Sequence, residues 1–320
     1  MLTRRELVIL APVMAALFAL PQIIAQPYLL QLVILACIDA IPAVGLNLML
    51  GYTGLVSLGH MAFAGIGGYA VAVMMVDAGM SFWLALPLAA LLAAVMGAAI
   101  GLVCLRLRSH FFVIVTLAFG LILGLIMNNW DAVTRGAQGF IGVPRPDPIR
   151  IAGLAIRFLS MTNFYYLTLT ALIVALALQL AIVRSDFGRT LTAIREDEVL
   201  ARFRGVDTMR YKVAIFAIGS GIAGIGGALS VTFLRVAAPG SFDLMASVNA
   251  VLIVIVGGAG YLLGPIWGAL LFVGIPEYLR IADNIRFILF GLVLIALTLY
   301  APQGLAGLFA TGLRRRRSTR

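Results

Sequence analysis

The run FWLALPLAALLAAVMGAAIGLVC occupies residues 82–104 and contains no charged side chain. A helix rises about 1.5 Å per residue and the hydrocarbon core of a bilayer is about 30 Å thick, so a run of this length spans a membrane. Similar runs recur along the 320 residues, of which 62% are hydrophobic and 11% charged, with a mean hydropathy of +1.09. Soluble domains are about half apolar and a quarter charged. The sequence therefore predicts an all-α polytopic membrane protein with one transmembrane domain over residues 1–320.

The apolar runs predict ten transmembrane helices. The third run is rich in glycine and the eighth is short. The first run follows Arg4 and Arg5, as the core of a signal peptide does, but no clear small-x-small cleavage site follows it. We therefore expect an uncleaved first helix. The expected helices occupy residues 7–25, 27–50, 52–76, 82–104, 111–128, 164–183, 213–233, 246–257, 262–280 and 285–301.

Basic residues are distributed unequally between the two sides of this topology. With the N-terminus inside, 16 of the 23 Lys and Arg residues fall in cytoplasmic segments. The positive-inside rule then places both termini on the cytoplasmic side of the membrane, which we expect to be a bacterial inner membrane. Topology also explains the formal charge of +10 better than nucleic-acid binding does. Residues 128–163, with several Gly and Pro, are expected outside as turns, and residues 184–211 form a cytoplasmic loop. The seven basic residues expected outside or at the outer ends of helices are Arg135, Arg145, Arg150, Arg157, Arg235, Arg280 and Arg286.

The cytoplasmic loop reads RSDFGRTLTAIREDEVLARFRGVDTMRYK over residues 184–212. Its apolar residues follow helical spacing in two pieces, which predicts two short amphipathic helices. The other faces mix acids with arginines, whereas helices that lie on a membrane surface are mainly basic. The pattern therefore favours docking into a groove on a soluble partner. The spaced apolar residues are Leu191 and Ile194 in the first piece, then Val199, Phe203 and Val206 in the second.

Residues 51–69 combine many glycines with polar side chains. Glycine allows helices to approach closely, and irregular backbone within a membrane is tolerated only against protein or water. We therefore expect this stretch to face the interior of the bundle. Its polar residues either line a substrate path or hydrogen-bond neighbouring helices. The residues concerned lie in or beside this stretch and are Asn47, Thr53, Ser57 and His60.

Groups able to carry chemistry are sparse in this chain. Cys37 and Cys104 lie in apolar runs and the two histidines lie far apart, so no metal site is predicted. The sole lysine, Lys212, is not part of a GxxxxGK[ST] motif, so any ATP and Mg must be held by other subunits. Asp39 is the only clear mid-span acid, which argues against a self-contained proton-coupled carrier. An intramembrane enzyme would need a nucleophile–base or metal cluster, which the sequence lacks.

Several segments resemble the LivM-type permeases of branched-chain amino-acid ABC importers. The loop segment Phe187-Gly188-Arg189 followed by AIREDE at 193–198 is similar to the family's coupling loop, the part that sits on the ATPase subunit. The resemblance covers about residues 40–300 and departs at Leu200 and at Phe203-Arg204, where smaller or apolar residues are typical. Further segments that resemble the family are GLN at 45–47, GYTGLVSLGH at 51–60, FAGIGGY at 63–69, TRG at 134–136, GVP at 142–144, AR at 201–202, GV at 205–206, GGAG at 257–260 and LGP at 263–265.

The resemblance implies an ABC importer permease fold and a transport subunit that is not an enzyme. It implies import of branched-chain or other hydrophobic amino acids by alternating access, with a second LivH-like permease, two ATP-binding subunits and a periplasmic substrate-binding protein as partners. No cofactor is expected on this chain. Permeases of this kind also carry urea or short amides, and a secondary carrier remains an alternative. The residues expected at the ATPase contact are Gly188, Arg195, Glu198, Val199, Ala201, Phe203 and Gly205.

Overall fold

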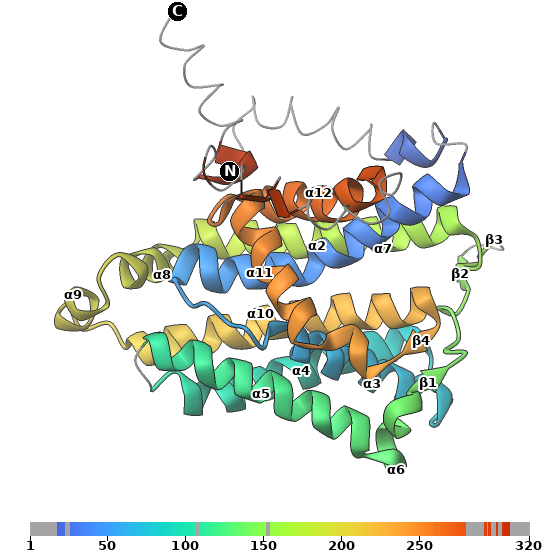
Figure 1. Cartoon of the computed structure of the whole chain (residues 1–320), viewed down its shortest axis with the longest axis horizontal. Coiled ribbons are helices and arrows are strands. Elements are labelled where there is room, and N and C mark those ends of the chain that lie inside the picture. The colour runs from blue at the N-terminus through green and yellow to red at the C-terminus, as the bar shows by residue number, and fades with distance from the viewer. Residues whose placement is uncertain are drawn as a thin grey trace, which may run out of the picture.

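The structure is a computed structural model, shown in Figure 1, and it describes most of the chain between residues 18 and 307. The first and tenth expected helices, residues 7–25 and 285–301, lie largely outside the described residues, as does the arginine-rich tail. The described residues are 18–22, 26–106, 109–151, 154–279, 291–292, 294–295, 299 and 303–307.

Helices dominate the described part of the chain, and six of its helical segments are long and apolar enough to cross a membrane. The molecule is therefore an all-α, multi-pass membrane protein, although the described residues do not reach the ten spans expected. α3 (His60–Val76) and α12 (Gly264–Tyr278) are shorter. The six are α2 (Pro27–Thr53), α4 (Phe82–Cys104), α5 (Ser109–Asn129), α7 (Met161–Arg184), α10 (Thr208–Leu234), and the 3-10 turn η2 (Pro239–Phe242) with α11 (Leu244–Gly258).

The third expected helix, over residues 52–76, is wrong at its start. α2 continues to Thr53 and ends at Gly54, whose φ of +77° is a left-handed conformation that glycine adopts without strain. Residues 54–59 are not helical, and α3 begins only at His60. This break is packed against other helices, because Leu55, Ser57 and Gly59 are all buried. Apart from the exposed Gly54, this irregular backbone lies wholly or partly in the protein interior, as membrane burial requires.

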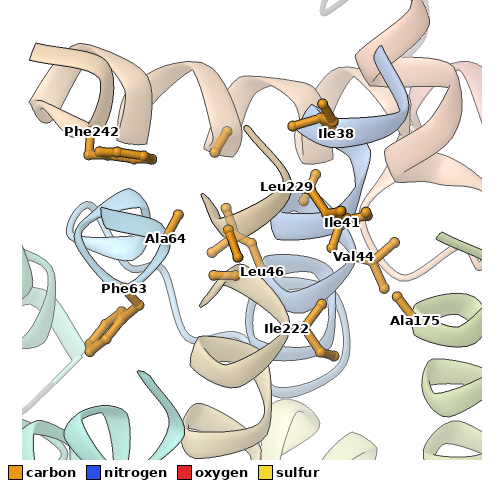
Figure 2. Packing of buried hydrophobic residues seen from close by; sticks show 14 of the residues in the cluster. Ile38, Ile41, Val44, Leu46, Phe63, Ala64, Ala175, Ile222, Leu229 and Phe242 are labelled. Carbon is orange, nitrogen blue, oxygen red and sulfur yellow. The ribbon is translucent and has the colours of Figure 1, made fainter. Parts of the chain in front are cut away.

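α10 forms the centre of the bundle and packs against α2, α3 and α4. Two close approaches depend on glycine. A Cβ on Gly45 of α2 would overlap the carbonyl oxygen of Gly219 on α10, and a Cβ on Gly227 would overlap that of Ala64 on α3. Such contacts let the backbones meet where side chains would separate them. Figure 2 shows side chains from α2, α3, α7 and α10 gathered in the resulting core.

The two ends of the bundle carry different kinds of structure (Figure 1). At one end, α8 (Asp186–Glu196) and α9 (Glu198–Phe203) form the loop between α7 and α10, as the apolar spacing predicts. The opposite end carries short antiparallel strands within and beside the expected outer segment. There β1 (Phe140–Ile141) pairs with β4 (Val236–Ala237), and β2 (Ile149–Ile151) pairs with β3 (Leu154–Ile156). α6 (Asp131–Thr134) and the 3-10 turn η1 (Gly136–Gln138) precede them.

Candidate functional site

The entry from α7 into α8 is a tight corner that requires glycine. Ser185 caps α8 by accepting a hydrogen bond from the backbone N–H of Gly188 at 3.3 Å. A Cβ on Gly188 would overlap the backbone carbonyl oxygens of Ile182 and Val183 at the end of α7. Gly188 is buried, so its place in the structure is this corner rather than an exposed contact surface.

Arg195, near the end of α8, reaches back to the transmembrane body. Its Nη1 donates a hydrogen bond to the carbonyl oxygen of Gly51 in the last turn of α2. A cation is favourable there, because the C-terminus of a helix carries partial negative charge and unpaired carbonyls. The bond fastens α8 to α2, which α8 also contacts directly, and Leu191 and Ile194 of α8 are buried. Arg195 is nevertheless exposed, so its place at the ATPase contact stays a prediction.

Glu198 fastens α9 to the start of α10. Its Oε1 accepts hydrogen bonds from Arg202 at 2.5 Å and from the hydroxyl of Thr208 at 3.1 Å, and its Oε2 accepts one from Lys212 at 2.5 Å. Burial raises the pKa of the Glu198 carboxyl, but the hydrogen bonds and charges of Lys212 and Arg202 outweigh this effect and hold the pKa below its ordinary value. The carboxylate is thus ionised at neutral pH and ties the two helices together.

α9 itself begins and ends with capping interactions that fix its direction. The side chain of Asp197 accepts hydrogen bonds from the backbone N–H groups of Val199 and Leu200, both at 2.9 Å. At the other end, Gly205 has φ +85°, and the N–H of Val206 bonds to the carbonyl of Ala201 at 3.1 Å. This pattern ends a helix with a left-handed residue, so Gly205 terminates α9.

The outward face of α9 is apolar. The side chain of Phe203 is 85% exposed, more than any other large hydrophobic residue in the described ranges, and Val199 and Leu200 are also exposed. Ala201 is buried, so it supports the helix from inside and does not reach the outer surface expected for it. Leu200 was noted in the sequence only as a departure from the family pattern. Leu200 follows Val199 directly and so falls outside the helical spacing, which is why the spacing did not place it on the exposed surface. We call this exposed surface the α9 patch, and it consists of Val199, Leu200 and Phe203.

The four polar residues around the glycine-rich stretch all lie in the bundle interior, as expected. Asn47 is fully buried, donates from Nδ2 to the carbonyl of Tyr261 at 2.9 Å, and accepts at Oδ1 from the N–H of Gly260 at 2.9 Å. This amide therefore joins α2 to the turn between α11 and α12. For Asn47, the observed contacts match the alternative in which the side chain hydrogen-bonds a neighbouring segment.

The other three polar residues differ in their partners. His60 Nε2 lies 2.9 Å from the carbonyl oxygen of Pro42 in α2, and this carbonyl can accept a hydrogen bond from the imidazole. Thr53 donates only to the carbonyl of Leu48 in its own helix at 3.2 Å. The Ser57 hydroxyl is buried and makes no hydrogen bond within the described part of the chain. Thr53 and Ser57 are therefore the two whose hydroxyl groups no other segment engages among the residues that the structure describes.

Two hydroxyl groups that the sequence reasoning missed hold the break between α2 and α3. Thr116 of α5 accepts a hydrogen bond from the N–H of Leu58 at 3.3 Å, and Ser247 of α11 accepts one from the N–H of Met61 at 3.1 Å. Both hydroxyls are buried. The available signal was a lone hydroxyl residue within an apolar run, because such a group needs a partner inside a membrane protein.

A cavity of about 540 Å³ lies between the α8–α9 loop and the adjacent ends of α2, α4 and α5. Thr53, Leu55 and Phe112 form part of its wall on the transmembrane side. The charged residues that line it are Arg106, Arg195, Glu198, Arg202 and Lys212.

Residues 28–298 match the family described as branched-chain amino acid transport system / permease component. The chain belongs to this family. Most of the permease is matched, including the α8–α9 loop, the break at residues 54–59 and the turn at Gly260. A permease component is a transport subunit and not an enzyme, in agreement with the expectation from the sequence.

Individual relatives are of two named types. The permease is 31% identical over 289 residues to the high-affinity branched-chain amino acid transport system permease protein LivM of Escherichia coli. The matched residues make up 85% of this chain and 68% of that relative. The LivM protein of Salmonella typhimurium is 30% identical, over 82% of this chain and 66% of that protein. The chain thus spans about two thirds of the length of these relatives. The LivH protein of Escherichia coli is 26% identical, over 84% of this chain and 91% of that protein. No solved structure gives a significant match.

Proposed function

We propose that this chain is one permease subunit of an ABC importer that carries branched-chain amino acids into the cytoplasm. Family membership and the similarity to LivM and LivH proteins support the proposal, and similarity to both types supports pairing with a second, LivH-like permease. The structural observation that carries it is the α9 patch, an exposed apolar surface on a helix that is clamped to α10 by Glu198 and capped at both ends.

In this proposal an ATP-binding subunit docks on the α9 patch from the cytoplasm, with Phe203 in its groove. Movement of that subunit passes into the membrane by two routes that the described contacts support. One runs through Glu198 and Lys212 into α10, and the other through Arg195 and Gly51 into α2. The full topology that we propose has ten spans with both termini in the cytoplasm. ATP and Mg are bound by the two partner ATPase subunits, and a periplasmic binding protein delivers the substrate.

For the permeation path we propose Thr53 and Ser57 as lining residues, because no other described segment engages their hydroxyl groups. Asn47 and His60 stabilise the wall of this path beside Thr53 and Ser57, through their hydrogen bonds to the carbonyls of Tyr261 and Pro42. This assignment makes the break between α2 and α3 the point at which the path meets the cytoplasmic end of the bundle.

The test is uptake of radiolabelled leucine, isoleucine and valine into proteoliposomes. One set contains the permease with its second permease, ATPase subunits and binding protein, and the other contains the permease alone. We expect uptake only from the complete set, and only with ATP inside and binding protein outside. Uptake by the permease alone would show a secondary carrier. Uptake of urea or acetamide in place of the amino acids would contradict the substrate class while leaving the importer assignment intact.

A further inference from the structure

The cavity beneath the α8–α9 loop carries more positive than negative charge. Four cationic side chains line it, against one carboxylate, Glu198, which already accepts hydrogen bonds from Arg202 and Lys212. Arg106 makes no ion pair with any described residue, and Arg195 bonds only to the backbone carbonyl of Gly51 among them. Cations held around one partly enclosed space repel each other, and an anion placed among them is stabilised.

The chemistry of these groups suits phosphate. Guanidinium groups offer planar, paired N–H donors that match phosphate oxygens, and a lysine ammonium adds a compact charge. Arg106 lies two residues after the end of α4, and Arg195 belongs to α8, so a phosphate between them would connect this end of α4 to the loop. The cavity volume of about 540 Å³ is large enough for a phospholipid headgroup.

The surroundings indicate a lipid rather than a soluble anion. Leu55, Leu105 and Phe112 give the cavity apolar wall beside the charges. The same turns of α4 and α5 expose Val103 and Phe111 at 68% and 58%, surfaces that suit acyl chains. The cytoplasmic leaflet is the one that carries anionic headgroups, and basic pockets between helices on that side are suited to them.

We propose that this cavity binds the headgroup phosphate of an anionic phospholipid from the cytoplasmic leaflet and thereby fastens the α8–α9 loop to the ends of α4 and α5. Val199 of the α9 patch lines the cavity, but Leu200 and Phe203 do not, so these two residues stay free for the ATPase contact. The inference rests on the proposed function only for the assignment of this end to the cytoplasm. Lipid binding in detergent can be measured without any transport, so the two can fail separately.

The experiment is native mass spectrometry of the purified full-length permease complex, titrated with phosphatidylglycerol or with phosphatidylcholine. We expect preferential binding of phosphatidylglycerol, weakened about fivefold by Arg106→Gln, the change that corresponds to about 1 kcal/mol per basic residue. Arg106→Lys should keep most of the binding. The matched control is Arg210→Gln, which removes an exposed arginine at the same end of the molecule but outside the cavity.

Three outcomes decide the proposal. Loss of phosphatidylglycerol in Arg106→Gln but not in Arg210→Gln supports the site. Equal binding by the wild type and Arg106→Gln, or equal binding of the two lipids, overturns it. Displacement of the lipid by an equimolar amount of inorganic phosphate shows a site for a soluble anion and overturns the lipid assignment. A thermal melt of each variant establishes that it is folded, and Arg106→Lys separates loss of charge from loss of packing.

Discussion

Nζ of Lys212 on α10 donates a hydrogen bond to Oε2 of Glu198 on α9 at 2.5 Å. The ammonium side chain is 12% exposed and the carboxylate 33%. Because α9 has only six residues, it has little helical stability of its own and depends on such contacts for its orientation. The pair therefore determines how firmly the α9 patch is connected to the central helix of the bundle.

Glu198→Gln should loosen α9 while leaving the transmembrane bundle folded. The change removes the charge that holds Arg202 and Lys212, at a local cost of up to about 1 kcal/mol, as for other partly exposed ion pairs. We expect faster proteolysis within residues 197–207 and weaker stimulation of the ATPase by loaded binding protein. Arg210→Gln, which breaks only the exposed pair with Asp207, is the matched control and should leave both readouts near wild type.

The same contact predicts a pH dependence with a defined sign. The pKa of Glu198 lies below its ordinary value of 4.5, so the carboxylate contributes stability above that value and loses it as the pH falls through the lowered pKa. Protection of residues 197–207 from proteolysis should therefore be constant from pH 7 to about pH 5 and decrease only below that range. A decrease between pH 8 and pH 6 would mean that a different group controls the loop.

Asn47→Leu tests the junction between α2 and the turn at residues 259–263. The substitution leaves the carbonyl of Tyr261 and the N–H of Gly260 without their side-chain partner, which costs about 1–3 kcal/mol for a buried group. We expect a clear fall in thermal stability in detergent. Thr53→Val, which loses only a bond within its own helix, should cost about 0.6 kcal/mol or less. Equal stability of the two variants would show that the Asn47 junction is not structural.

How much of this could be read from the sequence depended on the range of the interaction. Helical spacing predicted α8 and α9, because that signal is local. The hydrogen bond between Arg195 and Gly51 was not predicted, because the two residues lie 144 positions apart. The continuation of α2 to Thr53 and the break at residues 54–59 were missed because hydroxyls from α5 and α11 accept backbone hydrogen bonds there, and no local pattern shows such distant acceptors.

Gly227→Ala should damage assembly of the bundle far more than a typical alanine substitution. The added methyl group would overlap the backbone of Ala64 on α3, which cannot move away as a flexible side chain could. Such overpacking costs about 1–3 kcal/mol or more. Gly274→Ala on α12 is the matched control, because nothing lies within 4 Å of the new atom, and it should change stability by about 0.5 kcal/mol or less. Thermal melts of the two purified variants make the comparison.

Cysteine labelling tests the topology. In a background with Cys37 and Cys104 replaced, a cysteine at Thr192 on α8 and one at Ile141 on β1 should react with a membrane-impermeant maleimide from opposite sides. Both positions are exposed, so access to the side of the membrane decides the result. Thr192→Cys should label only after the membrane is made permeable. Labelling of both in intact cells would place the α8–α9 loop outside and contradict docking of a cytoplasmic ATPase.

Phe203→Asp is the most direct test of coupling. Docking of a large apolar side chain in a groove contributes about 1.5–3 kcal/mol, so replacing it by a carboxylate should weaken binding of the ATPase subunit more than tenfold. The side chain is 85% exposed in the isolated chain, so expression and thermal stability of the permease should not change. Phe203→Leu, which keeps an apolar anchor, should retain most of the binding.

Gly205→Val extends the same test from the anchor to the direction of the helix. The position has φ +85° and open space around it, so valine strains the backbone without meeting another atom. α9 should then end differently and present Phe203 at another angle, which reduces ATPase stimulation while the apolar patch remains. Co-purification of the ATPase subunit separates the two effects, because Phe203→Asp should lose the subunit and Gly205→Val should retain it with impaired stimulation. If both variants keep wild-type uptake and stimulation, the ATPase contacts the permease elsewhere and the α9 patch is not the coupling element.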